Sequence, residues 1–82
     1  MLQQKAKIIK VLSMEGIPKS LHMWMREVTY YRHDIITGRS AELFYDDNTK
    51  MTVTSHVQAI REDENNLVIT TENSVYYIKK FS

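Results

Sequence analysis

The sequence contains no cysteine, one proline and two glycines among its 82 residues. Small secreted domains usually depend on disulfides, so the lack of cysteine favours a reducing compartment and predicts a cytoplasmic protein. Gly16 and Gly38 are the only glycines, so the chain has no glycine-rich loop of the kind that holds a nucleotide pyrophosphate. We therefore expect neither a disulfide scaffold nor a cofactor.

Long apolar runs are missing as well. Lys5, Lys7 and Lys10 interrupt the N-terminal segment before it reaches the length of the apolar region of a signal peptide. No other stretch approaches the roughly 18 apolar residues of a membrane span. We therefore expect a protein that is neither exported nor embedded in a membrane.

The composition is typical of a single globular domain. Hydrophobic residues make up 43% of the chain and charged residues 26%, a balance that differs from that of disordered segments. A chain of this length forms one hydrophobic core, so we predict one domain spanning residues 1–82. A core of this size gives only modest net stability, and self-association as a homodimer would add to it.

Charge is distributed unevenly along the chain. Residues 1–40 carry a net charge of +4 and residues 41–82 a net charge of −3, although the whole chain carries only +1. The basic half could present a face to an anionic partner, or the two halves could complement each other within a monomer or between subunits. We favour complementary halves.

The second half of the sequence predicts an antiparallel meander. Turn signals at 46–49, 62–66 and 72–74 separate four runs that are rich in β-branched and aromatic residues. The runs are 41–45, 50–54 with 57–61, 67–71 and 75–78.

The last run is apolar on both of its sides. Val75 and Tyr77 form one stripe, and Tyr76 and Ile78 form another. A sheet with one wet face would not need the second stripe. Barrel closure, the N-terminal segment or another subunit could cover the second face, and the sequence leaves these alternatives open.

The N-terminal residues 2–14 fit two patterns. Their apolar spacing fits an amphipathic helix that Gly16 would end, whereas the β-branched residues from Ile8 to Leu12 fit a strand. The segment is short, which favours the strand slightly.

A short helix is predicted after Pro18. Ser20 is placed to cap it, and its apolar stripe would include Trp24, Met25 and Val28. Residues 30–39 show no clean period and predict a loop or an irregular strand. The fold class that follows is mainly β (α+β): a small antiparallel β-barrel or a strongly bent meander sheet, with one short helix near residues 20–28.

Catalytic signatures are lacking. His22, His33 and His56 do not have the spacing of a local zinc site. The acidic clusters at 46–47 and 62–64 lie in predicted turns, where acidic residues are typical of solvated hairpin tips. No serine lies in a nucleophile elbow or an S-x-x-K motif. We predict a protein that is not an enzyme and holds no metal.

Binding of a protein partner is the function that the remaining residues favour. Tyrosine, tryptophan, methionine and arginine are enriched at the centres of protein interfaces, and residues 22–32 supply several of them. Trp24 and Met25 are better explained as core residues. The predicted partner-binding residues are Met23, Arg26, Tyr31 and Arg32.

The alternative is a small β-barrel that binds nucleic acid. Basic and aromatic side chains would then share one surface, with lysines on phosphates and Tyr30 or Tyr31 stacking on bases. The predicted contacts for this alternative are Lys5, Lys7, Lys10, Tyr30, Arg32 and Arg39. The low net charge favours the opposing interpretation, in which a tyrosine packs inward and Arg32 pairs with an acid of the second half.

The segments TSHVQAI (residues 54–60) and LVITTENSVYYI (residues 67–78) resemble the C-terminal part of short uncharacterised proteins encoded by Gram-positive phages and mobile elements. The resemblance covers under a third of the chain. It implies a small phage product that inhibits or redirects a host protein by occupying one of its surfaces. It carries over no catalytic residues.

Overall fold

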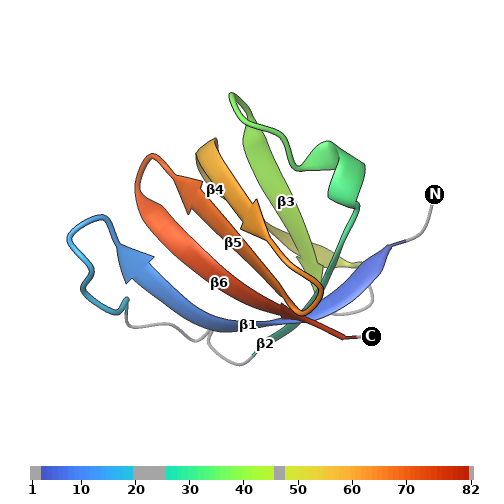
Figure 1. Cartoon of the computed structure of the whole chain (residues 1–82). Helices are drawn as coiled ribbons and strands as arrows, with labels where there is room; N and C mark the ends of the chain where they lie inside the picture. The colour runs from blue at the N-terminus through green and yellow to red at the C-terminus, as the bar shows by residue number, and fades with distance from the viewer. Residues whose placement is uncertain (1–2, 20–25, 46–47, 82) are drawn as a thin grey trace.

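Six strands and one short 3-10 helix form the fold, in a computed structural model that describes residues 3–19, 26–45 and 48–81. Each strand pairs antiparallel with the next, and β1 also pairs with β6, so the sheet closes into a barrel (Figure 1). The predicted small antiparallel barrel is confirmed. The elements are β1 (Gln4–Ser13), β2 (Arg26–Tyr30), η1 (Arg32–Asp34), β3 (Ser40–Tyr45), β4 (Lys50–Glu62), β5 (Asn66–Thr71) and β6 (Ser74–Lys80).

The N-terminal segment is a strand, as the sequence slightly favoured. Ala6 and Ile8 in β1 are fully buried, whereas Lys5 next to Ala6 is exposed. This is the two-residue alternation of a strand. A register shift between Ile8 and Lys10 then brings Val11 into the core.

The helix predicted near residues 20–28 is wrong in its C-terminal part, because Arg26–Tyr30 form β2. Residues 20–25 lie outside the described residues. Val28 is buried and Glu27 exposed, so this segment alternates with the period of a strand. Pairing with β1 sets Val28 opposite Ala6 and supplies backbone partners, whereas a short isolated helix is only marginally stable.

The predicted meander is confirmed from β3 to β6. A register shift interrupts the β3–β4 ladder between Ser40 and Glu42. There the backbone N–H of Ala41 donates to Thr54 Oγ1 at 3.0 Å, and this buried hydroxyl donates to the Ser55 carbonyl at 2.7 Å. The Thr54 side chain thus satisfies backbone groups at the register shift.

Closure of the barrel covers the second sheet face that the sequence left unassigned. β1 pairs with β6 in a register that sets Ile8 opposite Ile78 and Val11 opposite Tyr76. Tyr76 and Ile78 therefore face the interior, while Val75 and Tyr77 lie on the outer surface. The buried hydrophobic core comprises Ala6, Ile8, Val11, Val28, Tyr30, Ile35, Ala41, Leu43, Val57, Leu67, Ile69 and Ile78.

The segment between β2 and β3 follows the prediction of an irregular connection. It contains the single turn η1 and then a bend at Gly38, whose φ is +91°. Ile35 is 1% exposed and anchors this loop on the core. In the described part of the chain, no helix is long and apolar enough to cross a membrane.

Candidate functional site

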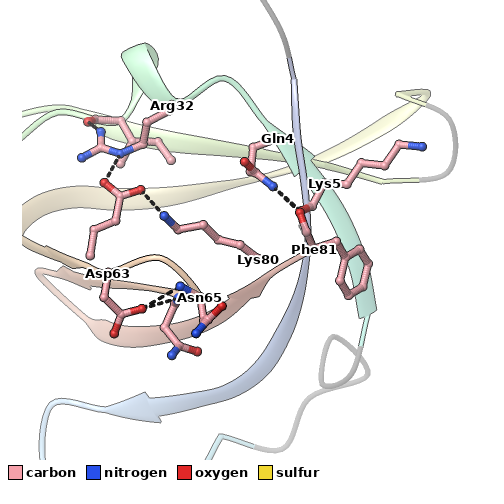
Figure 2. Close-up of polar contacts among 10 residues, drawn as sticks. Gln4, Lys5, Arg32, Asp63, Asn65, Lys80 and Phe81 are labelled. Carbon is pink, nitrogen blue, oxygen red and sulfur yellow. Dashed lines mark hydrogen bonds and ion pairs between the residues drawn. The ribbon is translucent and has the colours of Figure 1, made fainter.

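Arg32, a predicted partner-binding residue, is held by two contacts within the chain. Its Nε donates to Glu62 Oε1 at 2.9 Å, and its Nη1 donates to the Ile35 carbonyl at 2.9 Å. Lys80 Nζ lies 2.8 Å from the other carboxylate oxygen of Glu62 (Figure 2). Arg32 and Glu62 come from the basic and the acidic half of the chain, so this ion pair joins the two halves.

Both cations stabilise the ionised form of the Glu62 carboxylate. Its hydrogen bond with Lys80, followed by that with Arg32, holds the pKa of Glu62 below its ordinary value. Next to it, Asp63 Oδ1 accepts the backbone N–H groups of Asn65 and Asn66, each at 2.8 Å, and these bonds lower the pKa of Asp63 (Figure 2). Asp63 therefore closes the β4–β5 turn, whereas Glu62 pairs with residues outside it.

Tyr30 cannot serve as the base-stacking residue of the nucleic-acid alternative. Its side chain is 1% exposed and belongs to the core. Burial raises the pKa of Tyr30 to about 12, and the nearby Glu62 carboxylate adds to this rise. The Tyr30 hydroxyl has no hydrogen-bond partner among the described residues. The inward-packing interpretation is therefore correct for Tyr30.

Arg26 packs on an aromatic ring. Its guanidinium carbon lies 4.6 Å from the centroid of the Tyr45 ring, a cation–π contact that joins β2 to β3. Both residues are half-buried. Met23, predicted alongside Arg26, lies outside the described residues.

An exposed apolar cluster lies on the outer side of β3 and β4. Phe44 pairs directly with Met51, and Val53 follows Met51 on the same side of β4. The Tyr31 ring meets Phe44 edge-on, with centroids 6.1 Å apart. Met51 is 46% and Val53 55% exposed. We call Tyr31, Phe44, Met51 and Val53 the aromatic face.

A groove of about 670 Å³ adjoins the aromatic face and crosses β1, β2 and β3. Phe44 belongs to both surfaces, and the pairing of β2 with β3 in the described residues is the single bridge between Thr29 and Phe44. The lining includes Gln3, Lys5, Arg26, Thr29, Tyr45, Asn48 and Phe81. The groove thus supplies polar and charged groups beside an apolar surface.

Comparison with known proteins gives no relative. No protein-family model, curated protein or solved structure matches this chain. The candidate site therefore rests on the geometry of the barrel.

The structure brings one of the four predicted partner-binding residues, Tyr31, onto the aromatic face. Arg26 lines the adjoining groove, and Arg32 is engaged by Glu62. Met51 and Val53 were not predicted from the sequence. Alternation in 50–54 places both of them on one face of the strand and Thr52 and Thr54 on the other. That signal was available, but it did not show which of the two sides faces outward.

The lysines of the nucleic-acid alternative share one strand. Lys5, Lys7 and Lys10 project outward from β1, and Lys10 Nζ lies 4.8 Å from the centroid of the Tyr77 ring. Arg39 is exposed just before β3 and lies apart from them in the strand order.

The histidines do not form a metal site in the described residues. His33 Nε2 lies 3.2 Å from Asp34 Oδ1, and His56 is exposed on β4. Among residues 3–19, 26–45 and 48–81, no group of three or more histidine, aspartate or glutamate side chains could hold a metal ion. His22 lies outside these ranges.

Proposed function

We propose that this chain is a non-catalytic binding module that engages a protein partner through the aromatic face and the adjoining groove. The observation that carries the proposal is the cluster of exposed apolar side chains at Met51 and Val53, contiguous with the aromatic rings of Tyr31 and Phe44. Contiguous apolar surface of this kind marks protein interaction sites more often than scattered single residues do.

The composition of the surface supports a protein partner. An interface core is apolar and aromatic, and polar groups surround it. The aromatic face supplies the core, while Thr29, Asn48 and Glu42 supply polar neighbours from β2, the β3–β4 turn and β3. Thr29 Oγ1 donates to Asn48 Oδ1 at 3.1 Å, so these two rim residues are joined without a partner.

The chemistry of the partner follows from this arrangement. It should present an apolar side chain or a short apolar stretch to Phe44 and Met51, with hydrogen-bonding groups for the rim. The rigid barrel wall favours stoichiometric occupation of a surface. The resemblance to phage proteins implies one form of this function, an inhibitor or modulator of a host protein.

The test is affinity purification from a bacterial lysate with the wild-type chain and a Met51→Ser/Val53→Ser variant. Both side chains are about half exposed, so the variant should keep the melting temperature of the wild type. Wild type should retain one stoichiometric protein in the presence of nuclease and high salt. The variant should bind that protein roughly tenfold or more weakly, the loss expected when interface anchors are removed.

Met14→Ser/Ile17→Ser is the matched control. These side chains are 52% and 64% exposed, and they lie on the β1 hairpin, away from the aromatic face. Equal retention by both variants, or equal loss, would contradict the proposed site. A purified chain that is a dimer, and that becomes a monomer with Met51→Ser/Val53→Ser, would show that the face binds a second copy and would replace the proposal of a different partner.

A further inference from the structure

A second surface lies on the other side of the barrel, where β1, β6, β5 and the end of β4 run side by side (Figure 1). The strand registers align one outward row across all four strands. Lys10 is opposite Tyr77, Tyr77 is opposite Val68, and Val68 is opposite Arg61. With neighbouring strands about 4.8 Å apart, the row spans about 14 Å and has a cation at each end.

A second outward row adds further positive charge. Lys7 is directly opposite Lys79, and Lys5 precedes Lys7 on the same side of β1. Like charges directly opposite each other on a sheet destabilise it. In the described part of the chain none of these three lysines forms an ion pair, although Glu27 lies opposite Lys7 on β2. We call Lys5, Lys7, Lys10, Arg61, Tyr77 and Lys79 the basic face.

The basic face is also hollowed. A depression of about 330 Å³ is bordered by Tyr77, Val68 and Arg61, together with Ala59 and Thr70. It therefore extends along the row from Tyr77 to the Arg61 end. The aromatic ring of Tyr77 is half-buried at its edge. An aromatic platform flanked by cations is the arrangement that binds single-stranded nucleic acid without reading its sequence.

We propose that the basic face binds single-stranded nucleic acid, with a base stacked on Tyr77 and phosphates on Lys7, Lys10 and Lys79. Tyr77 lies away from the aromatic face, because β3 and β6 are farthest apart in the strand order of the barrel. Lys5 borders both the basic face and the groove beside the aromatic face. The stacking residue is Tyr77, a residue that the sequence did not single out for this role.

The contact between Lys10 and Tyr77 does not oppose this use. A lysine ammonium that stays in contact with solvent contributes less over a ring than a stacked base does. The four-carbon stem of lysine is flexible, so Lys10 can leave the ring and reach a phosphate. An anionic backbone would also relieve the repulsion between Lys7 and Lys79.

The experiment measures fluorescence anisotropy of a labelled oligothymidylate of roughly 12 nucleotides, a length within the usual site sizes. Affinity should fall with salt along a log–log slope of roughly −2 to −3, as expected for three or four phosphate contacts on a single strand. Lys7→Gln/Lys79→Gln should weaken binding and reduce the size of the slope by about 1.4. Tyr77→Leu should weaken binding by roughly 5- to 150-fold while leaving the slope unchanged.

Arg39→Gln/Lys50→Gln is the matched control, since it removes the same charge from the β3–β4 side. It should bind like wild type. The melting temperature of Lys7→Gln/Lys79→Gln should be unchanged or higher, because a like-charged pair has been removed. This readout separates lost contacts from lost folding.

A flat salt profile would overturn the proposal, as would equal weakening by the control variant. Duplex binding as tight as single-strand binding would exclude stacking on Tyr77. Binding to phosphatidylserine vesicles without binding to the oligonucleotide would show that the basic face serves a lipid surface. Failure of these tests leaves the aromatic face untouched, because the two sets of variants share no residue.

Discussion

Glu62 is the residue where the two halves of the chain are joined by charge. Its carboxylate bonds Arg32 from the β2–β3 connection through one oxygen and Lys80 from β6 through the other. The side chains of Arg32 and Glu62 are 42% and 30% exposed, so solvent screens their attraction. These ion pairs therefore add little free energy of folding. Their main effect is to hold the β2–β3 connection, the end of β4 and the end of β6 in position.

Glu62→Gln should lower stability at neutral pH by about 1 kcal/mol or less, the scale of exposed ion pairs. The pKa of Glu62 is lower in the folded chain than its ordinary value of 4.5, so its contribution is fully present above that value. The contribution is lost as the pH falls through the lower folded pKa.

Urea unfolding of wild type and Glu62→Gln across the acidic range checks this prediction. Asp63 titrates in both proteins, so the difference between their free energies of unfolding isolates Glu62. That difference should shrink below pH 4.5. If the difference between the two free energies of unfolding stays constant or grows in acid, the ion pairs of Glu62 with Arg32 and Lys80 are not its cause.

At the scale of elements, the turns and register shifts determine how each strand enters the wall. Gly38 ends the β2–β3 connection with a φ of +91°, and its N–H donates to the Val57 carbonyl at 2.8 Å. The Val57 N–H in turn donates to the Arg39 carbonyl at 2.9 Å. These two bonds hold the start of β3 against the middle of β4.

Gly38→Ala should destabilise the barrel by roughly 1–2 kcal/mol, because a residue with a Cβ is strained at this positive φ. A Cβ at Gly38 would have no heavy atom within 4 Å, so the loss comes from the backbone and involves no clash. Chemical denaturation measures the change in free energy. Gly38→Asn should lose less, since asparagine adopts positive φ more readily. Equal losses for both variants would point to a cause other than backbone strain.

At the scale of the whole molecule, closure joins the first strand to the last. β1 contacts β6 along most of its length, so the final seam pairs residues from the two ends of the chain. Contacts between residues far apart in sequence must be formed against the entropy of a large loop. We therefore expect this seam to form late in folding.

Refolding should accordingly be slow for a chain of this length, in the range of about a millisecond to seconds that is typical of all-β domains rich in non-local pairs. Stopped-flow circular dichroism after dilution from urea measures the rate. Most of the amplitude should appear in this phase. Complete recovery within microseconds would show that closure does not limit folding.

The sequence by itself determined the meander and the irregular connection around residues 30–39. Turn residues at 46–49, 62–66 and 72–74 act locally, and two-residue alternation depends only on the pleat of a strand. The sequence also indicated that the last strand needed cover on both of its sides. These features follow from local propensity and from the alternation of side chains along a strand.

Only the tertiary structure decided the remaining features, because they depend on which strands become neighbours. The segment at Arg26–Tyr30 is a strand because β1 supplies its backbone partners. Tyr30 became core while Tyr31 became surface, although the two are adjacent and chemically identical. Tyr77 lies between Lys10 and Arg61 through pairings that cross three strand boundaries. Registers of this kind are fixed by closure of the whole barrel, and no local pattern contains them.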